Sequence, residues 1–363
     1  MLLQEGIIVN EVYEVERFLG EGAFAEVYRV SHKFLGRQAL KVIKLPGLSL
    51  REIEEMLGEA VILSKIGHPN VIRVFDAGIM KTHNELHGFF TMEYVAGGSL
   101  ETFWRSHGAN LVSVSDAIDI IIQVCRGLAV AHSENPPIVH RDIKPQNILV
   151  GYDINGLRIR VSDFGLAKSV NPLTLLASAR GTRGFKPPEI MANMDSCAGD
   201  VWAIGTTLYL MLTDRLPYPN SYESDLLDCS CWEKPLIPAS RFNIRVNELL
   251  DTILFKSLAI KHEDRYRNAM EMLKDLTKWK PENAQRCSEK KPSTGESKCA
   301  LSPADQLSET LVKNKLEEAL SLAKQANKLT EAADILEEAF NLSPDLREKY
   351  EYRLKLWRCG IAQ

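Results

Sequence analysis

The feature that most constrains the fold is the stretch IVHRDIKPQNILV, residues 138 to 150, where charged and amide side chains stand between two apolar flanks. The polar side chains are His140, Arg141, Asp142, Lys144 and Asn147. Charged groups are rarely buried unless they are paired, so a segment built only for stability would not place them beside buried flanks. We therefore expect the flanks to anchor a polar cluster that is kept for its chemistry.

The chain around this stretch divides into a β-rich part and a helical part. Between residues 12 and 96, short β-branched and aromatic runs predict a small sheet, interrupted by one helical stretch from Arg51 to Ile66. Beyond Ser99, apolar residues recur at helical spacing after a predicted N-cap at Ser115. The predicted fold class is α+β, with a small β-rich lobe followed by a mainly helical lobe.

The end of the chain is predicted to form a separate unit. Residues 281 to 303 are polar and rich in Lys, Ser, Glu and Pro, which is typical of a linker. Residues 304 to 358 return to amphipathic helical patterns with breaks at Asn327 and Pro344. The predicted organisation is a domain at 12 to 280, a linker at 281 to 303 and a helical segment at 304 to 358.

Composition disfavours several classes of function. A net charge of −4 gives no reason to expect nucleic acid as a partner. The richest apolar run, residues 201 to 212, is too short to span a bilayer and predicts a buried helix instead. Residues 1 to 10 lack a signal-peptide pattern, and the seven cysteines are scattered without paired CxxC spacings. These features predict reduced thiols and a cytoplasmic location.

The stretch LGEGAFAEV, residues 19 to 27, lies between two predicted strands rather than before a helix. This context disfavours a phosphate site at a helix N-terminus. It favours a β-hairpin in which Gly20 and Gly22 let backbone amides close over phosphates. A tight hairpin turn that binds no ligand is the alternative for these residues considered alone.

Lys41 stands in a predicted strand, on the same face as the apolar Ala39 and Ile43. A buried lysine needs a carboxylate partner, which Glu59 in the following helix could supply, although Glu59 is equally consistent with a surface acid. Further along, Asn147 and Asp163 offer an amide oxygen and a carboxylate. These are oxygen ligands of the kind that Mg²⁺ prefers when it also binds phosphate.

Taken together, these motifs resemble those of the eukaryotic-type serine/threonine protein kinases. The matching motifs, in chain order, are Gly20-Glu-Gly22, Ala39-Leu-Lys41, Glu59, HRDIKPQN, DFG, GTRGFKPPE, DVWAIG and Arg265. The resemblance covers about residues 12 to 280 and implies a bilobal protein-kinase fold. It also implies ATP and Mg²⁺ as cofactors and proteins with Ser or Thr acceptors as substrates.

The resemblance implies a role for each matching residue. Asp142, with Lys144 beside it, would orient the acceptor hydroxyl and accept its proton. Asn147 and Asp163 would bind the metal ion. Lys144 and Thr182 match the pattern of Ser/Thr-directed rather than tyrosine-directed kinases.

The nucleotide would bind between the lobes. Lys41 would contact the α- and β-phosphates and pair with Glu59 in the active state. The complete nucleotide site implied by the resemblance is Leu19, Gly20, Gly22, Val27, Ala39, Lys41, Glu93, Val95 and Leu149. Glu189 keeps the acidic position of the Ala-Pro-Glu motif and is expected to form a structural pair with Arg265.

Arg141 beside Asp142 implies control by phosphorylation of the activation segment, because a phosphate there would give this arginine a partner. Ser169, Thr174 and Ser178 are the candidate sites, and we expect autophosphorylation at one or more of them. A pseudokinase that binds without turnover is a rival hypothesis, which the intact catalytic motifs disfavour.

The tail resembles a single tetratricopeptide repeat. Ala332, Leu336, Ala339 and Pro344 match the second-helix pattern, and a plain helical hairpin is the alternative. One repeat cannot bury a continuous core alone, so the tail is expected to pack on the kinase, pair with another chain or cap a partner's repeats. It could therefore dock a protein partner, and an adaptor whose tail does the main work is the second rival hypothesis.

Overall fold

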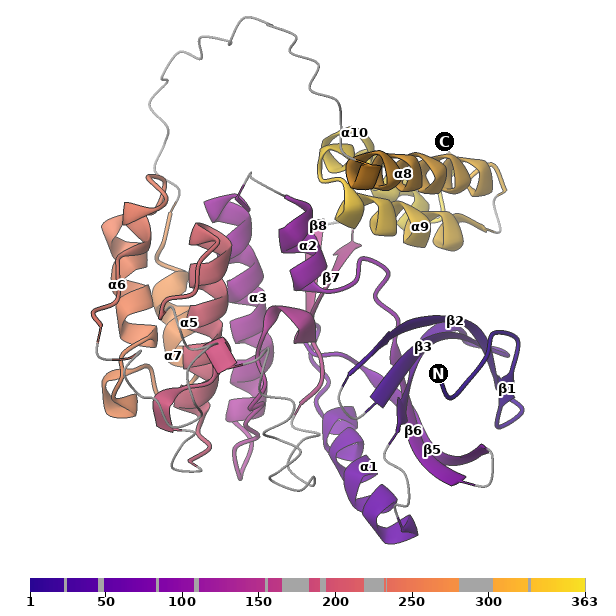
Figure 1. Ribbon diagram of the computed structural model, residues 1–363, viewed down its shortest axis with the longest axis horizontal. Coiled ribbons are helices and arrows are strands. Elements are labelled where there is room, and N and C mark those ends of the chain that lie inside the picture. The colour runs from indigo at the N-terminus through magenta and orange to yellow at the C-terminus, as the bar shows by residue number, and fades with distance from the viewer. Residues whose placement is uncertain are drawn as a thin grey trace, which may run out of the picture.

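The computed structural model shows a β-rich N-lobe (residues 1–93), a mainly helical C-lobe (residues 99–280) and three C-terminal helices (Figure 1). The residues that it describes are 1–22, 25–44, 49–82, 85–107, 111–153, 156–164, 183–189, 194–218, 232, 234–280, 303–325 and 328–362. The side chains of a few residues within these ranges, Glu59 among them, are not described.

The N-lobe is a six-stranded antiparallel sheet with one helix packed against it. Its strands are β1 (Ile8–Val9), β2 (Tyr13–Glu21), β3 (Ala25–His32), β4 (Gly36–Ile43), β5 (Val74–Thr82) and β6 (Glu85–Glu93), in the order β1-β2-β3-β4-β6-β5. Helix α1 (Leu50–Lys65) begins with a capping box between Ser49 and Glu52 and packs on β5 and β6. The predicted small sheet with one helix is confirmed.

The C-lobe is built around two long helices. Its elements are α2 (Leu100–Ser106), α3 (Val114–His132), the hairpin β7 (Ile148–Asp153) and β8 (Gly156–Val161), α5 (Cys197–Thr213), α6 (Glu248–Ser257) and α7 (Ala269–Leu276). Almost every side chain of α5 is buried, as its apolar sequence predicts. No helix in the described part of the chain is long and apolar enough to cross a membrane.

The N-cap of α3 is Ser113, so the prediction of Ser115 was wrong by two residues. Val114 already belongs to the helix, and the Ser113 hydroxyl accepts a hydrogen bond from the backbone N–H of Asp116 at 3.0 Å. Both serines are of the residue type that caps helices, and the hydroxyl that reaches the third helical N–H decides between them.

The tail consists of α8 (Pro303–Leu322), α9 (Leu329–Leu342) and α10 (Asp345–Arg358). Pro344 separates α9 from α10 as predicted, whereas Asn327 lies outside the described residues. The three helices share a small apolar core with the β7–β8 hairpin, in which the rings of Tyr152 and Phe340 meet edge to face with centroids 5.4 Å apart. The tail therefore packs on the rest of the chain.

Candidate functional site

The polar stretch at residues 138 to 150 is anchored by one buried carboxylate from α5. Asp200 accepts hydrogen bonds from the backbone N–H groups of His140 (2.7 Å) and Arg141 (2.8 Å). Burial alone would raise the pKa of Asp200, but the hydrogen bond from His132 and the neighbouring histidines hold it below its ordinary value. Asp200 is the first residue of the DVWAIG motif, and the sequence alone predicts no role for it.

His140 connects this stretch to the segment that carries Asp163. Its ring is fully buried, lies 2.8 Å through Nε2 from the carbonyl oxygen of Ser162 and packs on Phe164. Burial lowers the pKa of His140, so the ring is neutral at pH 7. Arg141 and Asp163 both have left-handed backbones, with φ of 68° and 61°, which residues other than glycine rarely adopt. Such conformations persist only where the surrounding contacts hold them.

Asp142 lies at the centre of a group of cations and amides. Its Oδ2 is 2.7 Å from Lys144 Nζ, and its Oδ1 is 3.1 Å from Lys186 Nζ. Asn147 Nδ2 donates to both the carbonyl oxygen (2.8 Å) and the carboxylate (2.9 Å) of Asp142. Burial would raise the pKa of Asp142, but Lys186 and Lys144 outweigh it and lower the pKa to about 2. The carboxylate is therefore ionised at neutral pH.

Lys186 contacts Asp142 although the sequence does not predict it. It belongs to the GTRGFKPPE motif, and its Nζ donates to the carbonyl oxygen of Arg141 at 2.7 Å as well as to Asp142. The resemblance to protein kinases implies that this motif positions a peptide substrate, but the spacing along the chain does not indicate that its lysine reaches the stretch at residues 138 to 150.

Lys41 is almost fully buried in β4, and its Nζ lies 2.6 Å from Asp163 Oδ1. Asn147 is brought to the same end of the β7–β8 hairpin, because its carbonyl oxygen accepts from the backbone N–H (2.9 Å) and the hydroxyl (3.0 Å) of Ser162. The side chain of Glu59 lies outside the described part of the structure, so its pairing with Lys41 stays a prediction.

The donor set suits a magnesium ion that is bound together with phosphate. The described residues contain no group of three His, Cys, Asp or Glu side chains that could hold a metal alone. Asn147 Nδ2 donates to Asp142, so the amide oxygen Oδ1 of Asn147 is the atom that could bind a metal ion, and the backbone of Asn147 contacts Ser162, which precedes Asp163. Mg²⁺ commonly takes one or two protein oxygens and completes its shell with phosphate and water.

Four apolar residues of the predicted nucleotide site belong to the main hydrophobic cluster of the chain or pack against it. Ala39 is buried in the main hydrophobic cluster of the chain. The partly buried residues that pack on the same cluster include Val27, Val95 and Leu149. Across the β2–β3 ladder Gly20 pairs with Val27, while Gly22 N donates to Ala25 O at 2.8 Å and closes the turn. The predicted hairpin is confirmed, and Leu19 at its side is partly exposed.

The segment between β6 and α2, residues 94–99, is the hinge that joins the lobes. At its start, the Glu93 carboxylate accepts from Arg158 Nη2 (2.8 Å) and Arg160 Nε (2.9 Å) of β8. Farther along, a Cβ added to Gly97 would lie 2.1 Å from the carbonyl oxygen of Val150. Glycine is required there because the hinge backbone passes directly against β7.

Three predictions concern the activation segment and its contacts, and the described residues bear on two of them. Ser169, Thr174, Ser178 and Thr182 lie outside the described residues. Glu189 and Arg265 form the predicted pair, with guanidinium-to-carboxylate distances of 2.6 and 2.8 Å. Arg141, expected to bind a phosphate, donates from Nε to Asp195 at 2.8 Å.

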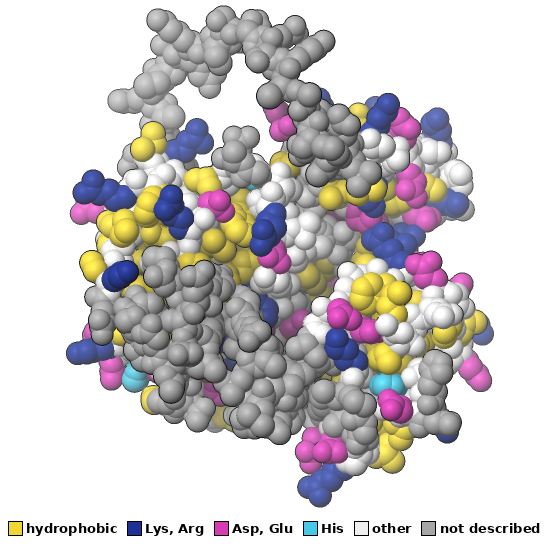
Figure 2. Space-filling model, viewed as in Figure 1, with side chains coloured by type: hydrophobic (Ala, Val, Ile, Leu, Met, Phe, Trp, Pro, Cys, Tyr) yellow, Lys and Arg dark blue, Asp and Glu magenta, His cyan; other side chains and the backbone are white. Residues whose placement is uncertain are grey.

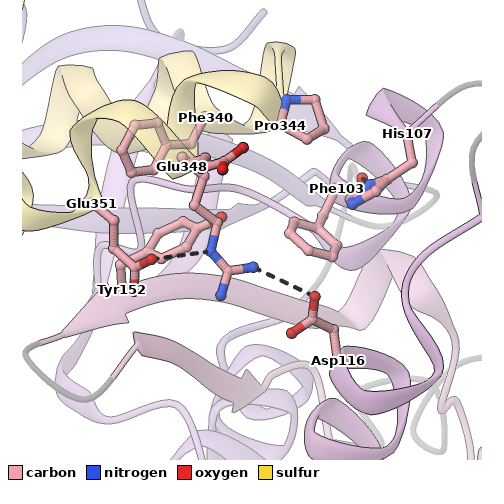
Figure 3. A pocket seen from close by; sticks show the side chains of 9 residues that line it. Phe103, His107, Asp116, Tyr152, Phe340, Pro344, Glu348 and Glu351 are labelled. Atoms are coloured by element: carbon pink, nitrogen blue, oxygen red, sulfur yellow. Dashed lines mark hydrogen bonds and ion pairs between the residues drawn. The ribbon is translucent and has the colours of Figure 1, made fainter. Parts of the chain in front are cut away.

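A cavity of about 340 Å³ lies where the C-terminal helices meet the C-lobe. Figure 3 shows the rings of Phe103, Tyr152 and Phe340 on its walls. Arg347 also lines it, with Nη1 3.7 Å from Asp116 Oδ2. The described residues that line this cavity include none of the predicted site residues, so it is separate from the group around Asp142.

Comparison with known proteins shows that most of the chain matches protein kinase domains. Residues 13–290 match the family model described as a protein kinase domain. The crystal structure of the PknI kinase domain of Mycobacterium tuberculosis aligns with a TM-score of 0.56 and 25% identity, over 76% of this chain and 99% of that chain. The observed order of a β-rich lobe and a helical lobe is thus that of a protein-kinase fold. The helices α8 to α10 lie beyond the family match.

The curated relatives are longer proteins that share this domain. The serine/threonine-protein kinase ATG1c of Arabidopsis thaliana is 33% identical over 224 residues, which is 61% of this chain and 29% of that protein. The serine/threonine-protein kinase PknB of Mycolicibacterium smegmatis is 30% identical over 279 residues, which is 74% of this chain and 43% of that protein. The chain therefore spans less than half the length of these relatives.

Proposed function

The chain belongs to the protein kinase family, and on that basis we propose that it transfers the γ-phosphoryl group of Mg-ATP to Ser or Thr hydroxyls of protein substrates. The observation that carries the proposal is the convergence of Lys41, Asp142, Asn147 and Asp163 from separate segments of the chain. The relatives reported above are named serine/threonine-protein kinases, which supports the choice of acceptor.

In this proposal Asp142 orients the acceptor hydroxyl and receives its proton as the hydroxyl oxygen bonds to the γ-phosphorus and the bond from that phosphorus to ADP breaks. A carboxylate with a pKa of about 2 is a weak base, so its main contribution is to hold the hydroxyl in line with the phosphate. Lys144 and Lys186 hold the carboxylate in place through its two oxygens. Preorganised charges of this kind lower the barrier because they do not reorient during the reaction.

Asn147 and Asp163 would hold the magnesium ion, and Lys41 would bind the α- and β-phosphates with Glu59 as its proposed partner. When bound, Mg²⁺ supplies positive charge that offsets the negative charge of the phosphate oxygens. The adenine would lie among Val27, Ala39 and Leu149. The remaining proposed nucleotide contacts are Leu19, Gly20, Gly22, Glu93 and Val95.

The acceptor is proposed to be a protein rather than a small molecule because the chain contains the GTRGFKPPE segment. Its last residue, Glu189, is fixed by Arg265, and its lysine, Lys186, reaches Asp142. We also propose autophosphorylation at Ser169, Thr174 or Ser178. A phosphate on one of them would compete with Asp195 for Arg141.

For the remaining parts of the chain we keep the domain limits 12 to 280, 281 to 303 and 304 to 358 as a proposal. The packing of α8 against α9 supports a tetratricopeptide-like helix pair, to which α10 is added. Docking of a protein partner on these helices is part of the proposal. We also propose a cytoplasmic location; among the described cysteines, Cys125, Cys197 and Cys359 are free thiols.

A transfer assay tests the proposal. Full-length protein incubated with γ-labelled ATP, Mg²⁺ and a generic protein substrate is expected to label serine and threonine, which phosphoamino-acid analysis distinguishes from tyrosine. The Asp142→Asn variant is the control and is expected to bind ATP without labelling the substrate. Wild-type protein that binds ATP but transfers no phosphate would instead support the pseudokinase hypothesis.

A further inference from the structure

Strands β2, β3 and β4 each present an arginine toward the C-terminal helices. Arg17 in β2 lies directly opposite Arg29 in β3, and Arg37 follows near the start of β4. Like charges placed opposite each other on neighbouring strands are destabilising. Glu16 of β2 offsets part of this charge, because its Oε2 lies 2.5 Å from Arg29 Nε and 3.2 Å from Arg37 Nε. Among the described residues, however, no acid of the sheet forms an ion pair with Arg17, so this arginine needs an anion from outside the sheet.

Glu338 of α9 supplies the anion that the sheet does not give to Arg17. Its Oε1 is 2.7 Å from Arg17 Nη2 and 3.6 Å from Arg29 Nη1, and it accepts a hydrogen bond from the Tyr94 hydroxyl at 2.9 Å. Its Oε2 is 2.6 Å from Lys315 Nζ of α8. The Glu338 side chain is only 9% exposed. One nearly buried carboxylate thus joins two strands of the N-lobe, the hinge and the neighbouring helix.

The other acids on this face of α9 extend the contact. Glu331 and Asp334 precede Glu338 at helical spacing, and both accept from Arg37, at 2.9 and 3.3 Å. Figure 2 shows basic and acidic side chains gathered where the C-terminal helices face the N-lobe. We call this contact surface, formed by α9 and strands β2 to β4, the seam.

The far end of α9 contacts the hinge and the C-lobe. Phe340 packs on Tyr152 of β7, and a Cβ added to Gly97 of the hinge would lie 3.4 Å from Asn341 Nδ2. Helix α9 therefore runs from the N-lobe strands across the hinge to the C-lobe. The part of the N-lobe that it holds through Arg17 and Arg29 is the hairpin that ends at Gly20 and Gly22.

We propose that Glu338 is a positioning residue for nucleotide binding. By binding Arg17, Arg29 and the Tyr94 hydroxyl together, it fixes the β2–β3 hairpin relative to the hinge. The hairpin carries the proposed phosphate and adenine contacts, and the hinge carries Val95 on the other side of the nucleotide. Glu338 touches no nucleotide itself, so it acts through the strands that it holds. The inference rests on the proposed function, because it assigns a nucleotide to this site.

Binding measurements on the full chain test the inference. The Glu338→Gln variant keeps the shape of the side chain and removes its charge. We expect its Kd for a fluorescent ATP analogue with Mg²⁺, and its KM for ATP, to rise by about fivefold or more, while kcat stays within about twofold. The matched control is Glu351→Gln in α10, whose carboxylate contacts Lys355 and Arg347 of its own helix and should leave Kd unchanged.

Two more variants separate positioning from mere folding. Tyr94→Phe removes one hydrogen bond to Glu338 and leaves the ring in place, so we expect a rise in Kd of about twofold. When Arg17→Met and Glu338→Gln are combined, the increases in Kd should be clearly less than multiplicative, because both substitutions break the same contact.

The outcomes are distinguishable. An unchanged Kd in Glu338→Gln, together with a lower melting temperature, would show a contact that serves stability alone and would overturn the inference while leaving the proposed function intact. A loss in kcat at constant Kd would overturn it as well. Wild-type protein that binds no Mg-ATP would refute the proposed function and this inference together.

Discussion

The cluster around Asp142 and the cluster around Glu338 both hold carboxylates between several cations, but they differ in how far water reaches them. The side chains of Asp142 and Asp163 are 28% and 32% exposed, whereas that of Glu338 is 9% exposed. Ionised groups that stay accessible can exchange their partners for a substrate or a metal ion. Ionised groups enclosed between a helix and a sheet can only hold these elements together.

The cations of the two clusters also differ, in how easily they exchange their partners. Those of the first cluster are Lys41, Lys144 and Lys186, and those that reach the seam from the sheet are Arg17, Arg29 and Arg37. A lysine ammonium is a compact charge on a flexible stem that re-forms its contacts easily, whereas the planar guanidinium of arginine favours fixed geometry. Similar ion pairs therefore allow partners to be exchanged around Asp142 and give permanent attachment around Glu338.

The largest effect is expected from a substitution that disrupts the cluster around Asp142 and leaves the cluster around Glu338 intact. In Asp142→Asn, kcat for phosphoryl transfer should fall by roughly 10²- to 10⁴-fold, because the amide can neither accept the proton nor orient the hydroxyl as a carboxylate does. Steady-state kinetics and ATP titration measure the two quantities. Affinity for the ATP analogue should change by less than about threefold. A large loss of affinity would place Asp142 in nucleotide binding instead.

A matched pair on one strand gives the next largest effect. Lys41 and Arg37 both lie in β4, but Lys41 contacts Asp163 and Arg37 contacts α9. Lys41→Met should lower kcat/KM for ATP by roughly 100-fold, since it removes a charge aimed at the phosphates. Arg37→Met should stay within roughly threefold of wild type. Equal losses in both variants would contradict the division between the clusters.

Acid titration gives a smaller effect that is specific to the first cluster. The pKa of Asp142, about 2, lies below its ordinary value of 3.8, so the stability it contributes is present above pH 3.8 and is lost as the pH falls toward 2. Lys186→Met removes the cation that lowers this pKa most. Urea unfolding below pH 4 should therefore show a loss smaller than the wild-type loss by roughly 1 kcal/mol. Equal acid sensitivity of the two proteins would argue against the Lys186 contact.

The smallest effect is expected at the outer edge of the seam. Glu331 is 37% exposed and pairs with Arg37 across water-accessible surface. Such pairs contribute about 1 kcal/mol or less, so Glu331→Gln should lower the free energy of unfolding by no more than that and leave the affinity for ATP unchanged. A rise in Kd as large as that of Glu338→Gln would mean that the whole acidic face, rather than one buried carboxylate, positions the hairpin.

Much of the domain could be predicted because its signals are local. The HRDIKPQN stretch and Asp163 flank one hairpin, so the β7–β8 ladder brings Asn147 and Asp163 to the same end. The glycine hairpin and the buried face of Lys41 follow from alternation along single strands. The Glu189–Arg265 pair depended instead on the resemblance to protein kinases.

The seam could not be predicted from the sequence in this way. Glu338 and Arg17 are 321 positions apart, and an acidic stripe on an amphipathic helix usually faces water. The role of Asp200 could not be predicted for another reason. It is a single acid in a helix whose composition indicates only that the helix is buried. Both contacts depend on tertiary packing, which residue spacing does not encode.

The shared apolar core of the tail and the β7–β8 hairpin affects how a shortened chain would behave. Tyr152 and Leu157 of the C-lobe pack with Leu336, Phe340 and Trp357 of the tail. Cutting the chain after residue 280 would therefore expose an apolar surface on the C-lobe. It would also leave Arg17 without its acid, and Arg29 and Arg37 with Glu16 alone. Such a fragment would tend to self-associate. A loss of activity in it would therefore not by itself show that the tail has a regulatory role.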